Sequence, residues 1–106
     1  MLFELRQYRT RPGKREAWVK MMEEEIIPFQ TSKGVVVVGS FVGEDEDDLY
    51  VWIRRFDSEA ERERLYEAVY ESDYWKNEIA PRIPEHLDRD RHVITRMEPT
   101  GKSVLR

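Results

Sequence analysis

The feature of this sequence that most constrains its fold is the order in which strand-like and helix-like patterns follow one another. Residues 2–10 alternate as a strand does, and a helical pattern starts at Lys14. Two strand-like segments follow, and a second helical region precedes a last strand from about Arg91 to Met97. All of this occupies 106 residues, the length of one domain. We therefore expect one α+β domain with four strands.

Proline and glycine residues divide the first half of the chain. Pro12 and Gly13 end the first strand, and Pro28 is expected to kink or end the helix that follows. This helix is expected because five apolar residues recur at helical spacing: Trp18, Met21, Met22, Ile26 and Phe29.

A hairpin is expected next. The valine run at 35–38 favours a strand, and its doubly apolar pattern predicts that both faces of this strand are covered. The acidic run at 44–48 lacks the central glycine and closing glutamate of a calcium loop, so we interpret it as a solvated hairpin tip. Strand-like residues resume over 49–56.

The second helical region begins with a recognisable signal. Ser58 and Glu61 fit the S-x-x-E capping box, which satisfies free N–H groups at the start of a helix. Leu65, Ala68 and Val69 form its apolar stripe, and Pro81 is expected to end its last piece. The resulting order of elements is the βαββαβ pattern of ferredoxin-like folds, with a four-stranded antiparallel sheet over residues 1–98 and a frayed C-terminal tail at 99–106.

Composition excludes several classes of function. The chain carries 22 acidic against 18 basic residues, so it lacks the basic surface that nucleic-acid binding needs. It has no cysteine, which excludes thiol catalysis and thiolate metal sites. No apolar run approaches the about 20 residues of a membrane span, and the first residues do not resemble a signal peptide. We expect a soluble, cytoplasmic protein that binds neither nucleic acid nor membranes.

The predicted fold leaves one face of the sheet without helices. We expect that face to carry Tyr8, the large aromatics Tyr50 or Trp52, and part of the valine strand. Such an apolar patch is large for a monomer, and a second copy is its simplest cover. The prediction is a homodimer in which two sheets enclose a ligand cavity.

Alternating side chains on the first strand form one candidate site. Glu4, Arg6 and Tyr8 offer a carboxylate, a guanidinium and a phenol that can hold a carbonyl or phenolic ligand. The structural alternative is an ion pair that supports a barrel wall or a dimer seam. Trp52 and Arg54 can face the same space, where they offer a flat apolar surface and a fixed positive charge, although Trp52 also fits a plain core position.

The remaining candidates are aromatic or imidazole side chains. Trp75 can form part of an aromatic wall over a cavity, or it can pack in the core. Histidine is the residue type whose unperturbed pKa lies near neutrality, and of the two histidines, His86 and His92, His92 is retained as a candidate ligand-binding residue. Neither lies in a metal-binding motif, so no metal and no cofactor are expected.

Several short motifs, taken together in order and spacing, resemble the NIPSNAP family. That family belongs to the dimeric α/β-barrel superfamily, which also holds antibiotic-biosynthesis-type monooxygenases and stress-responsive barrel proteins. The resemblance covers about residues 2–98 and rests on FELRQY at 3–8, RPGK at 11–14, VWIRRF at 51–56, and Trp75. It implies a ferredoxin-like protomer, a homodimer and a barrel interior.

The family motifs fall on particular residues of this chain. The first-strand motif falls on Glu4, Leu5, Arg6 and Tyr8, and the bacterial-type third-strand motif falls on Trp52, Arg54 and Phe56. The animal-like form has a tryptophan where Arg54 stands, so the roles of animal members are not carried over.

Three functions remain open from the sequence. The leading interpretation is a dimeric barrel that binds a small, partly aromatic or carboxylate-bearing molecule. The second is a cofactor-independent monooxygenase-like or isomerase-like enzyme, by analogy with related barrels. The third is a non-catalytic structural or adaptor dimer whose interior is filled by side chains.

Overall fold

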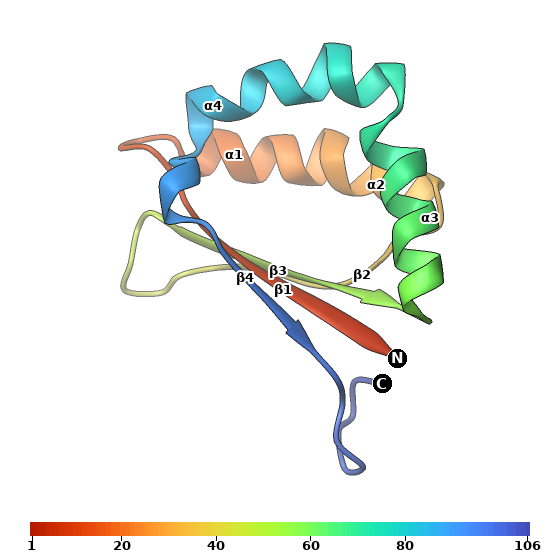
Figure 1. Ribbon diagram of the computed structural model, residues 1–106. Coiled ribbons are helices and arrows are strands. Elements are labelled where there is room, and N and C mark those ends of the chain that lie inside the picture. Colours follow the sequence, from red (N-terminus) through yellow and green to blue (C-terminus); the bar gives the residue numbers. More distant parts are fainter.

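The computed structural model describes all residues from 1 to 106 and places its four strands in one sheet (Figure 1). In this structure η1 and η2 are π-helical turns, and η3 and η4 are 3₁₀ turns. The elements in chain order are β1 (Leu2–Arg9), α1 (Arg15–Met21), η1 (Met22–Ile26), α2 (Ile27–Ser32), β2 (Val36–Val42), β3 (Leu49–Phe56), α3 (Glu59–Tyr70), η2 (Trp75–Ile79), η3 (Ala80–Arg82), α4 (Ile83–His86), η4 (Arg89–Arg91) and β4 (Val93–Met97).

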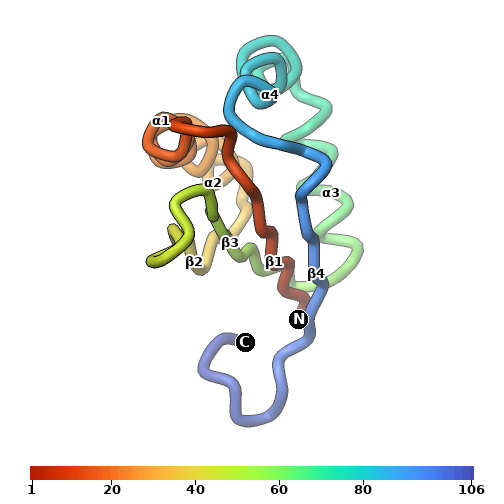
Figure 2. The backbone as a smooth tube through the Cα atoms, turned by 90° about the vertical axis from the view of Figure 1, so that its left-hand side faces the viewer, coloured from red at the N-terminus to blue at the C-terminus, as the bar shows by residue number.

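The strands lie in the order β2-β3-β1-β4, and every neighbouring pair is antiparallel. Both helical segments cover the same face of this sheet, and the segment from η2 to α4 runs back along α1 and α2 (Figures 1 and 2). The expected α+β, ferredoxin-like βαββαβ architecture is confirmed. None of the helices is both long enough and apolar enough to span a membrane.

Prolines do not end the helices where the sequence predicts. The first helix continues past Pro28 to Ser32, because Pro28 lies in the first turn of α2, immediately after the π-helical turn η1. Pro81 and Pro84 each lie in the first turn of η3 and α4, where no N–H donor is required. The expected end at Pro81 is therefore wrong, and of the two alternatives expected at Pro28, a kink or an end, the helix does not end there.

The capping box at the start of α3 is confirmed. The Ser58 hydroxyl accepts a 3.1 Å hydrogen bond from the Glu61 N–H, and the Glu61 carboxylate accepts one of 3.1 Å from the Asp57 N–H. Leu65 and Val69 are buried one turn apart on the inner face of the helix. The cap thus positions α3 over the sheet.

Within one protomer, the valine strand is not covered on both faces as the sequence predicts. β2 lies at the edge of the sheet, and its register shifts between Val37 and Gly39. Most of its residues are half-buried or exposed, and Val36 and Val42 are exposed outright. An edge strand with a bulge packs against the helices only in part, which leaves its apolar residues uncovered.

The aromatic residues of β1 and β3 also face the opposite way from the prediction. Pairing of the two strands sets Tyr8 beside Tyr50 and Arg6 beside Trp52. The side chains of Tyr8, Tyr50 and Trp52 are buried in the main apolar core with Trp18 of α1, beneath the helices. Large rings bury the most apolar area there, so they do not lie on the uncovered face.

The uncovered face of the sheet is nevertheless apolar. It is formed by the other set of alternating residues, and two of these, Phe41 and Val93, are 54% and 51% exposed. The apolar side chains on this face include Phe3, Leu5, Val36, Phe41, Val51, Ile53, Val93 and Met97. A flat apolar surface of this kind is a candidate interface.

The C-terminal residues turn back beneath this face (Figure 1). The Arg106 carbonyl accepts a 2.7 Å hydrogen bond from Nε of Arg55 on β3. Leu105 lies near Phe3, which is buried although it belongs to the face without helices. The predicted frayed tail is therefore a loop that covers one end of the sheet.

Candidate functional site

A buried ion pair joins the two central strands beneath the helices. The register of β1 and β3 places Glu4 directly opposite Arg54, and both side chains are fully enclosed. The Glu4 carboxylate accepts a 2.5 Å hydrogen bond from Nη2 of Arg54. Cross-strand neighbours lie about 5 Å apart at Cβ, so strand pairing alone brings these charges together.

Glu4 is surrounded by more positive charge than it can neutralise. Nε of Arg6 donates to it at 2.8 Å and Nε of Arg62, on α3, at 3.1 Å, so three guanidinium groups share one carboxylate. The Tyr66 hydroxyl donates to the same carboxylate at 2.6 Å. The cluster formed by Glu4, Arg6, Arg54 and Arg62 therefore has an excess of two positive charges.

These contacts keep Glu4 ionised. Burial acts to raise the pKa of its carboxyl, but the Arg54 charge and the hydrogen bonds from Tyr66 and Arg6 outweigh burial and lower the pKa from 4.5 to about 2. Arg54 is held on its other side by the Gln30 amide oxygen at 2.9 Å and the Tyr70 hydroxyl at 2.8 Å. Hydrogen bonds thus hold the charged side chains of the cluster in place beneath the helices.

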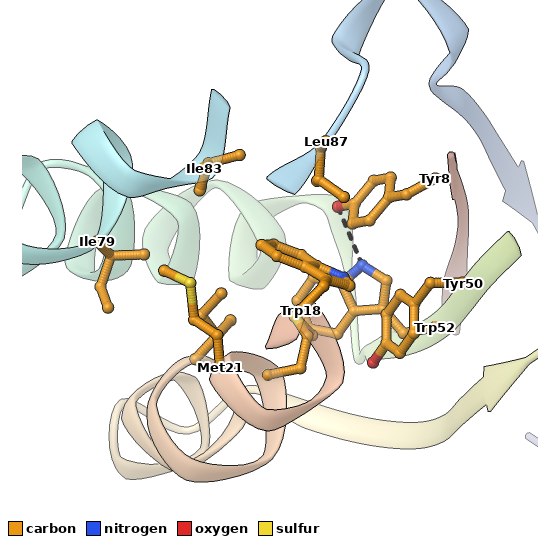
Figure 3. Close-up of a cluster of buried hydrophobic side chains, with 10 residues drawn as sticks. Tyr8, Trp18, Met21, Tyr50, Trp52, Ile79, Ile83 and Leu87 are labelled. Atoms are coloured by element: carbon orange, nitrogen blue, oxygen red, sulfur yellow. Dashed lines mark hydrogen bonds between the residues drawn. The ribbon is translucent and has the colours of Figure 1, made fainter. Parts of the chain in front are cut away.

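A pocket of about 130 Å³ lies beside this cluster, between the sheet and the helices. Figure 3 shows part of its wall, with the Tyr8 hydroxyl turned towards the indole nitrogen of Trp52 and with Trp18 beside them. Most of its lining is aromatic or aliphatic. The lining residues are Arg6, Tyr8, Trp18, Met22, Ile26, Trp52, Tyr70, Trp75, Ile83, Leu87, Arg89 and His92.

Both π-helical turns contribute to this wall. Met22 and Ile26 are the first and last residues of η1, and Trp75 is the first residue of η2. Turns of this type are rare in α-helices and occur frequently at functional sites. Two of them in the lining of one pocket support its choice as the functional site.

The polar groups of the pocket are mainly hydrogen-bond donors. Arg6 uses three of its five N–H groups, on Glu4, Tyr8 and Tyr66, and it keeps two. Arg89 is exposed at the pocket, and no side-chain hydrogen bond or ion pair engages it. No aspartate or glutamate lines the pocket, although the chain as a whole has a net charge of −4.

His92 closes one side of the pocket. Its ring lies 4.3 Å from that of Tyr8, centroid to centroid, and its Nε2 atom is buried without a hydrogen-bond partner. Burial lowers the pKa of His92, and the positive charges of Arg89 and Arg6 lower it further. The imidazole is therefore neutral at pH 7 and adds no positive charge of its own.

The structure separates the residues suggested by the sequence into two groups. Glu4 and Arg54 lie in the charged cluster and do not line the pocket. Five others line it together: Arg6, Tyr8, Trp52, Trp75 and His92. All seven belong to the space between sheet and helices of one protomer, so the expected location between two facing sheets is wrong for this site.

Sequence reasoning missed several members of the site. Arg62 and Tyr66 are not among the candidate site residues from the sequence, yet both contact Glu4. Their four-residue spacing, continued by Tyr70, is the pattern that places three side chains on one helix face. Trp18 was recognised only as core, and Arg89 lies in a short turn that gives no sequence signal.

A larger hollow of about 740 Å³ lies between α1 and the end of β2. Its lining is mostly charged and exposed, with Arg15, Glu16, Lys20 and Glu23 among its residues. Its charged side chains are of both signs, and it has no aromatic residue. We therefore assign the functional site to the smaller, aromatic pocket.

Comparison with known proteins agrees with this fold and these motifs. The family model for NIPSNAP matches residues 3–100. The chain belongs to the NIPSNAP family. No curated protein sequence matches it. The matched range includes every residue of the pocket and of the charged cluster.

Solved structures extend the comparison. A NIPSNAP family protein of unknown function from Agrobacterium tumefaciens is 27% identical with a TM-score of 0.88, over 100% of this chain and 94% of that one. An uncharacterised NIPSNAP domain protein from Burkholderia xenovorans is 21% identical with a TM-score of 0.86, over 97% and 98%. An antibiotic biosynthesis monooxygenase shares the fold at 15% identity and a TM-score of 0.69, over 94% and 99%.

Proposed function

We propose that this NIPSNAP chain is a homodimer in which each protomer binds a small, partly aromatic or carboxylate-bearing molecule. The ligand lies in the pocket between the sheet and the helices. The observation that carries this proposal is the combination of an apolar, aromatic wall with polar groups that are mainly hydrogen-bond donors. A few placed polar groups in an otherwise apolar pocket are typical of small-molecule sites.

The size of the pocket limits the ligand. An apolar cavity of about 150 Å³ accommodates benzene, and the pocket here measures about 130 Å³. One planar ring therefore fits, with its polar substituent on Arg6. The indole rings of Trp18, Trp52 and Trp75 provide flat surfaces for such a ring.

The homodimer is supported by the uncovered face of the sheet. Phe41 and Val93 are more than half exposed there, and Val51 and Ile53 lie on the same face. A second copy that applies the same face covers both patches at once, which is the ordinary isologous arrangement of a twofold dimer. The pocket lies on the other side of the sheet, so each protomer keeps its own site.

Native mass spectrometry followed by denaturing mass spectrometry tests both parts together. We expect twice the chain mass of 12.8 kDa under native conditions, with a small molecule released on denaturation. A monomer at micromolar concentration would contradict the dimer. A ligand-free dimer that also binds no single-ring compound would favour the structural or adaptor function.

Intrinsic fluorescence provides a direct binding assay, because all three tryptophans of the chain line the pocket. Benzoate is expected to change this fluorescence, and Arg89→Ala is expected to weaken its binding by up to about fivefold, because an exposed ion pair contributes up to about 1 kcal/mol. Arg64→Ala is the matched control, since Arg64 is exposed on α3 outside the pocket. Equal affinities for both variants would exclude Arg89 from the site.

A further inference from the structure

The Tyr8 hydroxyl is saturated as an acceptor. Its oxygen accepts a hydrogen bond of 3.0 Å from Nε1 of Trp52 and one of 3.2 Å from Nη1 of Arg6. A tyrosine oxygen has two acceptor positions, and both are occupied. What remains available on this group is its proton.

Neither neighbour of this hydroxyl can take that proton. Indole and guanidinium groups are donors only, so Trp52 and Arg6 can donate to Tyr8 but cannot accept from it. No hydrogen bond joins the Tyr8 proton to any acceptor in the chain, while the ring lies in the pocket wall. Towards a ligand in the pocket, the Tyr8 hydroxyl can therefore act only as a hydrogen-bond donor.

We infer that Tyr8 and Arg6 together select ligands that accept hydrogen bonds, and that the ligand is a carboxylate carried on a single aromatic ring. This inference rests on the proposed function of the pocket. One carboxylate oxygen accepts from the Tyr8 hydroxyl and the other from a free N–H of Arg6. Trp52 is a positioning residue, because its N–H occupies the acceptor position through which Tyr8 would otherwise bind a donor.

The surroundings favour this choice of ligand. The charged cluster behind Arg6 holds two positive charges in excess, and no acidic side chain lines the pocket. Burial raises the pKa of Tyr8, so its proton stays in place at neutral pH. A ligand that offers only donors would leave the Tyr8 proton and the Arg6 N–H groups buried without partners, which is costly.

Three probes of the same shape test the inference in the folded protein. Benzoate offers only acceptors, benzamide offers both kinds of group, and benzamidinium offers only donors. Their dissociation constants are measured by tryptophan fluorescence and checked by calorimetry. We expect benzoate to bind at least about tenfold more tightly than benzamide, and benzamidinium to show no binding.

Variants then assign the selection to particular groups. Tyr8→Phe keeps the ring that packs on His92 and is expected to weaken benzoate about tenfold or more, with a smaller effect on benzamide. Trp52→Phe keeps an apolar wall but frees one acceptor position on Tyr8, so the ratio of benzoate to benzamide affinity is expected to fall. Tyr50→Phe is the matched control, because the Tyr50 hydroxyl is bonded to Ser40 and lies outside the pocket.

The possible outcomes separate this inference from the proposed function. Benzamide or benzamidinium binding as tightly as benzoate would overturn the inference and leave the pocket as a ring-binding site. Failure of all three probes to bind would count against the proposed function itself. An unchanged affinity ratio in folded Trp52→Phe protein, as judged by circular dichroism, would remove Trp52 from its positioning role.

Discussion

Replacement of Glu4 by glutamine tests the buried charged cluster. The change keeps the size of the side chain and removes the carboxylate that Arg6, Arg54 and Arg62 share. The pKa of Glu4 falls from 4.5 to about 2 on folding. A difference of this size corresponds to about 3 kcal/mol of stability at neutral pH, and one-sided loss of a buried ion pair commonly costs about 3–5 kcal/mol. We therefore expect Glu4→Gln to lower the free energy of unfolding by about 3 kcal/mol at pH 7.

The effect has a definite dependence on pH. The folded-state pKa of Glu4 is depressed, so its contribution is complete above about pH 4.5 and is lost as the pH falls towards 2. The native protein loses this contribution on acidification, whereas the glutamine variant has none to lose. The difference between the two proteins should therefore shrink to less than half of its neutral value at about pH 3.

Urea unfolding followed by tryptophan fluorescence measures both quantities. A domain of this size has a total stability of about 5–15 kcal/mol, so the variant is expected to remain folded at neutral pH. A loss below about 1 kcal/mol at pH 7, or an equal loss at pH 7 and pH 3, would refute the reasoning. As a control for the charge, Arg54→Met in the Glu4→Gln background removes the guanidinium left unpaired, so the double variant should lose less than the sum of the two single losses.

Three further predictions concern the scaffold. Ser58→Ala removes the cap of α3 and should lower the free energy of unfolding by about 1 kcal/mol in urea, with an unchanged slope; a loss of a few tenths would contradict the cap. Ile53→Glu places a charge on the uncovered face and should give monomers in sedimentation velocity with an unchanged circular dichroism spectrum; a persistent dimer would move the interface elsewhere. Arg82→Ala removes an ion pair in which Arg82 donates two hydrogen bonds to Glu25 and so joins the helical segments. The free energy of unfolding should fall by up to about 1 kcal/mol, and by less in high salt; a salt-independent loss would point to packing instead.

The order of elements could be predicted from the sequence because hydrophobic period and turn residues are local signals. The alternation of β1 correctly separated Phe3 and Leu5 from Glu4, Arg6 and Tyr8. It did not show which set the helices cover. Polar residues usually face water, but here Glu4 is fully buried because three arginines from two strands and a helix surround it. That arrangement exists only after the chain has folded.

In the candidate site, too, the sequence indicated useful residue types but not the contacts that form on folding. Tyr8 and Trp52 were recognisable as chemically useful side chains, but their hydrogen bond joins residues 44 positions apart and depends on the strand register. Arg89 had no local pattern to mark it, since it lies in a three-residue turn. The valine strand was misjudged because its position at the edge of the sheet is set by strand order, which apolar composition does not report.

The two π-helical turns affect how the pocket can change shape between related proteins. Each corresponds to one residue more than a regular α-helix of the same path would need, so one-residue insertions can create such turns. Removal of one residue from η2 would turn the following part of the helix by about 100°. Ile83, which lines the pocket beyond η2, would then face elsewhere. Single-residue insertions and deletions at these two turns, rather than substitutions in the sheet, therefore offer relatives of this chain a short route to pockets of different shape.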